Sequence, residues 1–153
     1  MFQIVALPRE TFVPLFDQDD TTLAARGIVR RTAEGGEPCR VSLEDAAPGE
    51  TVYLLPHVHH DVSSPYRACG PIYVRERAET ARLEPDAIPA TLDRRLLSVR
   101  GYDEHGMLVQ AEVLEGTALR DIIQAMFADA TIAYLHVHNA RPGCFNCRIE
   151  RAG

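Results

Sequence analysis

The sequence contains no lysine, because all 16 of the basic side chains among its 153 residues are arginines. This absence excludes a Schiff base to lysine, a covalent pyridoxal phosphate linkage and the lysine of a phosphate-binding loop. The Gly-x-Ser-x-Gly hydrolase elbow, the Gly-x-Gly-x-x-Gly dinucleotide loop and the His-Glu-x-x-His zinc motif are missing too. No catalytic motif therefore names a reaction.

Long basic runs and long apolar runs are also missing. The net charge is −6, and acidic residues interrupt the densest basic groups, Arg75/Arg77 and Arg94/Arg95, so nucleic-acid binding is disfavoured. No segment approaches the roughly 18 apolar residues of a membrane span, and the first residues do not resemble a signal peptide. We therefore expect a cytoplasmic protein that uses no membrane and keeps its four cysteines as thiols.

The composition is that of one globular domain spanning residues 1–153. Hydrophobic residues make up 46% and charged residues 25% of the chain, the balance of an ordinary folded protein. Short apolar runs between glycine and proline turns predict strands near residues 2–7, 27–32, 39–43, 51–55, 71–75, 96–102, 107–114, 131–137 and 144–149.

Two segments have the pattern of helices. Residues 17–26 suit a short helix that ends at Gly27. A second helix follows Gly116, with Thr117 as its expected N-cap, because one apolar stripe recurs at helical spacing in Leu119, Ile122, Ile123, Met126 and Phe127. These elements do not alternate, which predicts an α+β fold with a largely antiparallel, curved sheet and two main helices.

Histidines form the clearest candidate site. Residues 51–60 and residues 131–139 each contain an apolar strand that turns polar at its C-terminal end through His-Val-His, although the first group could already leave its strand after Pro56. In a strand, residues i and i+2 share one face about 6.5 Å apart. If the two strands are neighbours and run the same way, three or four imidazoles converge. Such a group could bind zinc, iron, nickel or copper, or it could act as acid or base without metal. Alternatively, these are strand-end histidines that bond to backbone or water.

Two further segments carry reactive groups. Tyr66, Arg67 and Arg75 could present a phenol and guanidinium groups to a carboxylate or phosphate, or the arginines could simply pair with surface acids. Cys144 and Cys147 form a Cys-x-x-Cys motif, but in a strand their side chains would diverge. We expect small structural thiols, with a nucleophilic Cys144 near His138 left open.

Several of these motifs together resemble one bacterial family of domains of unknown function, number twelve-oh-three. The resemblance covers nearly the whole chain and rests on residues 38–46, 48–52, 64–68, 70–76, 106–109 and 133–140. It implies a single-domain bacterial protein and carries no activity. It favours His59 with His136 and His138 over a set that includes His57 and His60, and it does not include Cys147.

The leading hypothesis is a polar pocket with His59, His136 and His138 at its centre as catalytic residues or tentative metal ligands. Around them, the residues expected to orient a small anionic or polar molecule are Tyr66, Arg67, Arg75 and Asn139. The alternative is a non-catalytic module that binds a small ligand, a metal or a protein. The reaction, the metal, the cofactor and the oligomeric state are not determined by the sequence.

Overall fold

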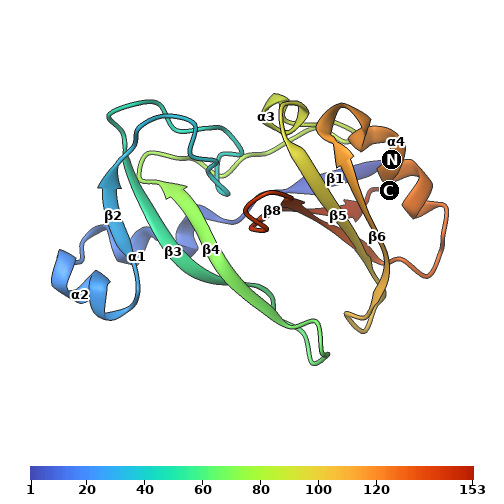
Figure 1. The fold of residues 1–153 in the computed structure, drawn as a ribbon, viewed down its shortest axis with the longest axis horizontal. Coiled ribbons are helices and arrows are strands. Elements are labelled where there is room, and N and C mark those ends of the chain that lie inside the picture. Colours follow the sequence, from blue (N-terminus) through green and yellow to red (C-terminus); the bar gives the residue numbers. More distant parts are fainter.

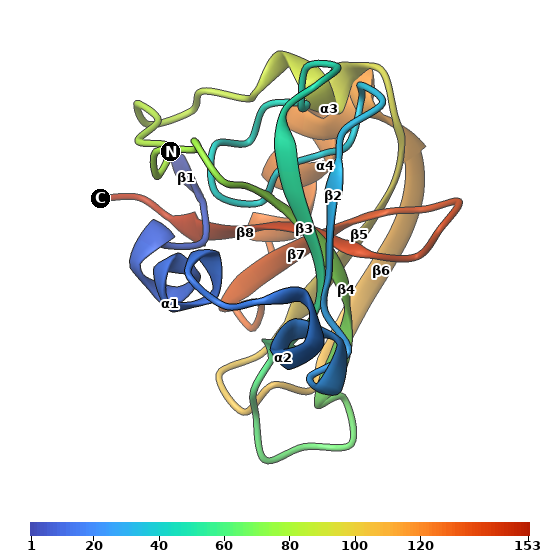
Figure 2. The ribbon, with the colours of Figure 1, turned by 90° about the vertical axis from the view of Figure 1, so that its left-hand side faces the viewer.

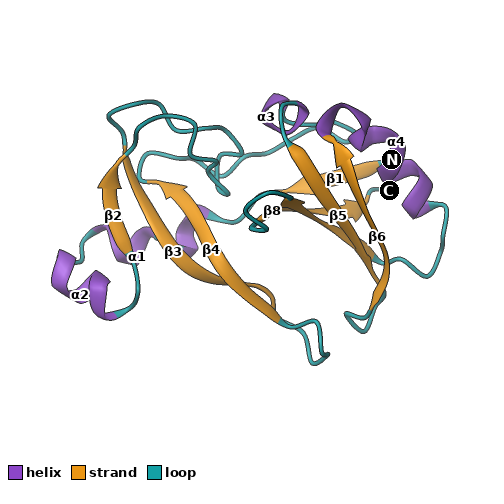
Figure 3. Cartoon of the chain, in the orientation of Figure 1, coloured by secondary structure: helices purple, strands orange, loops and turns teal.

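The computed structural model describes residues 1–153, in which eight strands and four α-helices follow one another along the chain (Figures 1 and 3). The strands are β1 (Phe2–Val5), β2 (Val29–Thr32), β3 (Thr51–His60), β4 (Ala68–Arg75), β5 (Leu96–Tyr102), β6 (Leu108–Glu115), β7 (Tyr134–Asn139) and β8 (Phe145–Arg151). The helices are α1 (Val13–Phe16), α2 (Asp20–Ala25), α3 (Ala90–Asp93) and α4 (Leu119–Phe127), with 3-10 turns η1 (Arg9–Thr11) and η2 (Gly116–Ala118).

The strands form two antiparallel sheets that face each other. One sheet has the order β1-β8-β7-β5-β6 and the other the order β2-β3-β4. Figure 1 shows them as two walls that splay apart at one end, and Figure 2 shows β7 and β8 crossing β3 at a steep angle. The predicted α+β class with antiparallel pairing is confirmed. Two main helices and one curved sheet are not confirmed.

The larger core lies between α4 and the five-stranded sheet. The apolar stripe predicted for this helix is confirmed, because Leu119, Ile123 and Met126 are fully buried while Ile122 and Phe127 pack at the margin. The sheet side of the same cluster consists of Leu97, Val99, Leu135, Val137, Cys147 and Ile149. Burial of this apolar area supplies the main driving force that holds the helix on the sheet.

The start of α4 differs from the prediction. Thr117 is not the N-cap, because η2 takes up residues 116–118 and the N-cap is Ala118, which forms no side-chain capping bond. Close packing against α3 explains this entry: a Cβ at Gly116 would lie 1.7 Å from the carbonyl oxygen of Leu92. Only glycine allows so close a backbone approach, and tertiary packing rather than capping therefore sets the beginning of the helix.

The smaller core lies under the three-stranded sheet. Phe12, Leu15 and Leu23, from the N-terminal helical segment, pack against Tyr53 and Ile72 of β3 and β4. Strand β3 is longer than the predicted 51–55, since it continues to His60. It can pass through a proline because β2 pairs only with residues 51–54, which leaves no ladder partner on that side for the proline to disrupt.

Residues 39–43 were predicted as a strand, and this prediction is wrong. The segment folds back on itself: the Leu43 N–H donates to the Cys39 carbonyl at 3.0 Å, and Leu43 has a φ of 56°. Pro38 and Asp45 form an isolated bridge across this turn. The turn directs Arg40 into the space between the sheets, where its side chain is 1% exposed.

The longest helix, α4, has nine residues, and none of the helices has the length and apolar character that a bilayer crossing requires.

Candidate functional site

The two histidine segments meet, although their strands belong to different sheets. His59 of β3 faces β7 across the space between the sheets, with its ring centroid 5.1 Å from that of His138 and 6.2 Å from that of His136. His136 and His138 lie 6.3 Å apart on β7. The expected convergence of these three rings therefore arises by face-to-face packing of strands that share no hydrogen bonds.

His60 joins this group through an irregularity in β3. The register with β4 shifts between Val58 and His60, so that the strand contains one extra residue. A bulge of this kind allows consecutive side chains to reach one face. The His60 ring lies 4.9 Å from that of His136. The ring of His57, by contrast, lies against that of Phe12, with 5.9 Å between the ring centroids, and it forms no ring contact with the group.

The hydrogen bonds of His60 are complete. Its Nδ1 donates to the carbonyl oxygen of Tyr66 at 2.8 Å, because a carbonyl can only accept. Its Nε2 then accepts from the Tyr134 hydroxyl at 2.7 Å. With both ring nitrogens bonded and the side chain 2% exposed, His60 is held as a structural histidine between the sheets.

The other three histidines of this group each have one buried ring nitrogen without a hydrogen-bond partner. Nδ1 of His59, Nδ1 of His136 and Nε2 of His138 are buried without a hydrogen-bond partner. The tautomer of His138 follows from its neighbours: Nδ1 donates to the Gly143 carbonyl at 2.9 Å, so in the neutral ring Nε2 carries the lone pair. Buried polar atoms without partners are rare in folded proteins, and three of them in one cluster make this group the candidate site.

Burial keeps these histidines neutral. It lowers the pKa of His136 to about 2, with further contributions from His60 and His138. Burial likewise lowers the pKa of His59 to about 4, and that of His138 to about 4. Neutral imidazoles can accept protons or bind metals. The structure, however, contains no group of three or more histidine, cysteine, aspartate or glutamate side chains arranged to hold a metal ion.

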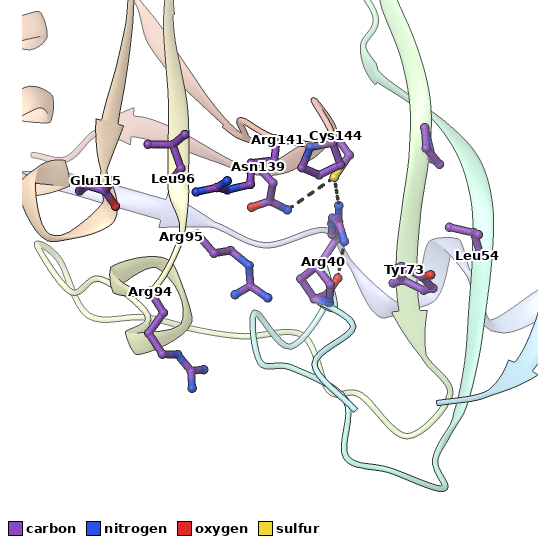
Figure 4. Close-up of a pocket in the computed structure, with 13 residues that line it drawn as sticks. Arg40, Leu54, Tyr73, Arg94, Arg95, Leu96, Glu115, Asn139, Arg141 and Cys144 are labelled. Carbon is purple, nitrogen blue, oxygen red and sulfur yellow. Dashed lines mark hydrogen bonds between the residues drawn. The ribbon is translucent and has the colours of Figure 1, made fainter. Parts of the chain in front are cut away.

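A cavity of about 550 Å³ lies beside the histidines, and arginines dominate its polar lining (Figure 4). Its walls come from both sheets and from the loops that follow β7 and precede β5. Arg94 and Arg95 share the carboxylate of Asp45, at 3.4 Å and 2.9 Å. Arg141 is exposed and Arg40 is buried. Neither of them takes part in any of the ion pairs of the chain.

Arg40 is the residue that the sequence hypothesis missed. Its Nε donates to the Phe145 carbonyl at 2.7 Å, one Nη donates to the Pro38 carbonyl, and the other donates to the Cys144 sulfur at 3.0 Å. Burial lowers the pKa of this guanidinium, while Cys144 opposes that shift. A fully buried arginine without a carboxylate is costly. Its position within the motif at 38–46 is the sequence signal that pointed to it.

Cys144 connects the arginine cavity with the histidines. A smaller cavity of about 280 Å³ is lined by His59, His138 and Arg100, and it shares Cys144 with the larger one. Pro71 and Pro142 also line both. The two cavities are therefore adjacent, with four arginines lining the larger one and two imidazoles and Arg100 lining the smaller one.

The four residues expected to bind substrate lie in different places. Asn139 lines the larger cavity, and its amide donates to the Cys144 sulfur at 3.5 Å. Tyr66 and Arg67 lie in the loop between β3 and β4, where Arg67 pairs with Asp61 at 3.2 Å. Arg75 is bound by Glu50 at 2.9 Å near the other end of β4. The structure thus brings only Asn139 of this set to either cavity.

Comparison with known proteins identifies one family. A family model described as protein of unknown function (DUF1203) matches residues 36–151, which confirms the resemblance seen in the sequence. The matched region includes both histidine segments, Arg40 and Cys144. No curated protein and no solved structure matches the chain.

Proposed function

We propose a function for this chain from its site alone, since the chain belongs to this family of proteins of unknown function and the family assigns it no activity. The protein is a cytoplasmic protein that binds a small anionic molecule and acts on it through histidine acid/base chemistry. The arginines hold the negative charge, and His59, His136 and His138 transfer protons. The observation that carries the proposal is Arg40, which lines the larger cavity, is 1% exposed and has no carboxylate partner.

The donors of Arg40 suit an anion. A guanidinium has five N–H donors, and the three described hydrogen bonds leave two of them available. A carboxylate or phosphate is the group that guanidinium donors recognise best. Asn139 and Arg141 line the same cavity and add neutral and charged donors. A bound anion would supply the negative charge that the protein itself does not provide at Arg40.

His59 and His138 are close enough to respond to such an anion, because the smaller cavity that they line shares wall residues with the arginine cavity. With no ligand, burial keeps the pKa of His138 near 4, which makes it a weak base. A nearby negative charge favours the protonated ring and raises a histidine pKa. Binding of the substrate would thus bring the base toward the range in which it works at neutral pH.

A binding module without catalysis is the second candidate. The observation that favours it is the low pKa of His136, about 2, which burial, three neighbouring histidines and Arg148 produce. A ring held neutral so firmly can fix the orientation of a ligand by hydrogen bonds without exchanging a proton. Metal-assisted chemistry at the same three histidines stays a weaker hypothesis.

The four cysteines agree with a reducing compartment. All four are free, two of them buried and two at least partly exposed, and disulfides are rare in the cytosol. This supports the cytoplasmic part of the proposal.

Titration calorimetry tests the proposal. Inorganic phosphate, acetate and citrate are titrated into the protein at pH 6.5 in buffers of different ionisation enthalpy. We expect at least one of them to bind with uptake of protons, and we expect His138→Gln to reduce that uptake. Binding without uptake would favour the non-catalytic module. Absence of binding by all three would contradict the anion site.

Two exposed arginines provide a matched pair of variants. Arg141→Gln removes a charge that lines the larger cavity, whereas Arg67→Gln removes a charge from the loop between β3 and β4. Losing one charge-assisted contact should weaken anion binding about tenfold in the first variant, with no change in the second. The opposite result would move the anion site to the loop.

A further inference from the structure

The sulfur of Cys144 receives two hydrogen bonds and gives none that the structure describes. Arg40 donates to it at 3.0 Å and the amide of Asn139 donates at 3.5 Å. A sulfur that accepts hydrogen bonds from a cation and from an amide lies in the electropositive surroundings that are typical of reactive cysteines. The side chain is only partly buried, so a small reagent can reach it.

Cys144 is the only side chain that accepts a hydrogen bond from Arg40. The two other partners of Arg40 are the neutral carbonyl oxygens of Phe145 and Pro38. The sulfur therefore lies directly against a buried guanidinium that has no carboxylate partner.

The neighbouring Cys147 shows the contrast. It is fully buried in the larger core, and burial raises the pKa of its thiol to about 12. Cys144 lies just before β8 and Cys147 lies within it. The sulfur of Cys144 faces cations and cavities, whereas the sulfur of Cys147 faces apolar side chains. The two cysteines are therefore not a redox pair, and only Cys144 is placed for chemistry.

A second observation at the same place points to a ligand. His138, which is 1% exposed, has a buried Nε2 without a partner and lines the 280 Å³ cavity together with Cys144. On its other side, Cys144 lines the arginine cavity. A small molecule that spans both cavities would put its anionic group against the arginines and its next atoms against the sulfur and the imidazole.

We propose that Cys144 is a nucleophile toward small anionic electrophiles. The thiolate attacks an electrophilic carbon, a sulfur–carbon bond forms, and the bond from that carbon to its leaving group breaks, with the leaving group taking the bonding electron pair. The preference for anions rests on the proposed function, because it uses the same arginines. The nucleophilic character rests only on the contacts of Arg40 and Asn139 with the sulfur.

Alkylation of the intact protein tests both parts. Iodoacetamide is neutral and iodoacetate is anionic, and each reacts by displacing iodide from carbon. Rates at Cys144 and at Cys69 are measured by mass spectrometry of the corresponding peptides at pH 7. Cys69 is exposed and lines the smaller cavity too, but Arg40 donates to Cys144 and not to Cys69, so Cys69 serves as the internal reference for a thiol at the same cavity without the guanidinium contact. We expect Cys144 to react at least tenfold faster than Cys69 with iodoacetamide, and the ratio of iodoacetate rate to iodoacetamide rate to be at least fivefold higher at Cys144.

Two variants separate the causes. Asn139→Asp keeps the shape of the side chain and puts a carboxylate beside the sulfur and Arg40, and we expect it to slow alkylation of Cys144 at least tenfold by either reagent. Arg141→Gln leaves both sulfur contacts intact, and we expect it to lower only the iodoacetate preference. Arg40→Met tests the contact more directly, because it removes the guanidinium itself. If Arg40→Met does not fold, Asn139→Asp serves in its place.

The outcomes are distinct. Fast alkylation of Cys144 without an iodoacetate preference supports the nucleophile and contradicts the anionic substrate, and with it the proposed function. Alkylation of Cys144 no faster than that of Cys69 overturns the nucleophile, whatever the calorimetry with phosphate shows. Fast alkylation that Asn139→Asp leaves unchanged also overturns it, because the thiolate would then not depend on the contacts described.

Discussion

Arg75 and Arg40 are both largely buried, but only the region around Arg75 provides a carboxylate partner for its guanidinium. Near the end of β4, Arg75 is held by both carboxylate oxygens of Glu50, at 2.9 Å and 3.0 Å. In the cavity between the sheets, Arg40 is more deeply buried and receives no carboxylate. Because an unpaired buried charge costs free energy, the cavity carries a cost that the chain avoids elsewhere. This difference supports the proposal that a bound ligand supplies the negative partner of Arg40.

The histidines beside Arg40 repeat this contrast. His60 has partners for both of its ring nitrogens, whereas His136 and His138, on the facing strand, each have a buried nitrogen with none. Complete hydrogen bonding stabilises the position of His60, whereas the unpaired nitrogens of His136 and His138 are available to an exchangeable partner. The four predictions below test this comparison between satisfied and unsatisfied groups.

Acid should produce the largest effect. The folded-state pKa values of His136 and His138, about 2 and about 4, lie below the ordinary value of 6.5, so the unfolded chain binds more protons than the folded chain between pH 6.5 and pH 4. Stability is therefore lost as the pH falls through this window. From pH 6.5 to pH 5 we expect each histidine to cost about 2 kcal/mol of the free energy of unfolding.

Urea unfolding at pH 7, 6 and 5 measures this loss. His136→Gln should make the pH dependence shallower, and His105→Gln, at an exposed histidine in the loop between β5 and β6, serves as its control. Equal slopes in the two variants would contradict the assignment of the effect to the buried cluster.

Replacing Arg40 should remove the response to anions. Phosphate at about one hundred times its dissociation constant stabilises a protein that binds it by about 2.7 kcal/mol. We expect Arg40→Met to abolish this gain, since methionine fills a similar volume without charge. Thermal unfolding with and without phosphate provides the measurement. A variant that keeps the full stabilisation would show that the anion binds elsewhere.

Replacing Arg75 should lower stability and leave the response to anions unchanged. Arg75→Met leaves Glu50 without its cation in a partly buried position, and we expect it to lower the free energy of unfolding by about 2 kcal/mol. The response to phosphate should stay as in the original protein. If Arg75→Met instead weakens phosphate binding, then the sequence hypothesis that placed this residue at the ligand is correct and the comparison with Arg40 fails.

The smallest effect is expected at His60. Tyr134→Phe removes the hydroxyl that donates to Nε2 of His60 at 2.7 Å and leaves a buried acceptor without a donor. Such a loss costs about 1 kcal/mol, and it should not alter anion binding. Chemical denaturation measures the cost, and an unchanged stability would mean that the bond contributes nothing net.

Local patterns in the sequence were sufficient for most elements. The stripe of α4 and the β5–β6 hairpin were predicted almost to the residue, because helical and strand periodicities are short-range properties of the chain. The turn at 39–43 was missed because its apolar residues have the pattern of a strand. The left-handed conformation of Leu43, which forms the turn, has no signal in that pattern. The N-cap of α4 was also missed, because the contact of Gly116 with Leu92 joins elements that local patterns do not relate.

The sequence by itself determined that histidines gather at the ends of two apolar strands and that the chemistry of this protein proceeds without lysine. Only the tertiary structure decided that these strands lie in different sheets, that a bulge turns His60 inward, and that Arg40 and Cys144 meet from positions 104 residues apart. Periodicity specifies which face of an element is apolar, whereas the partner that each buried polar atom receives depends on how the two sheets pack, and the site is made of those partners.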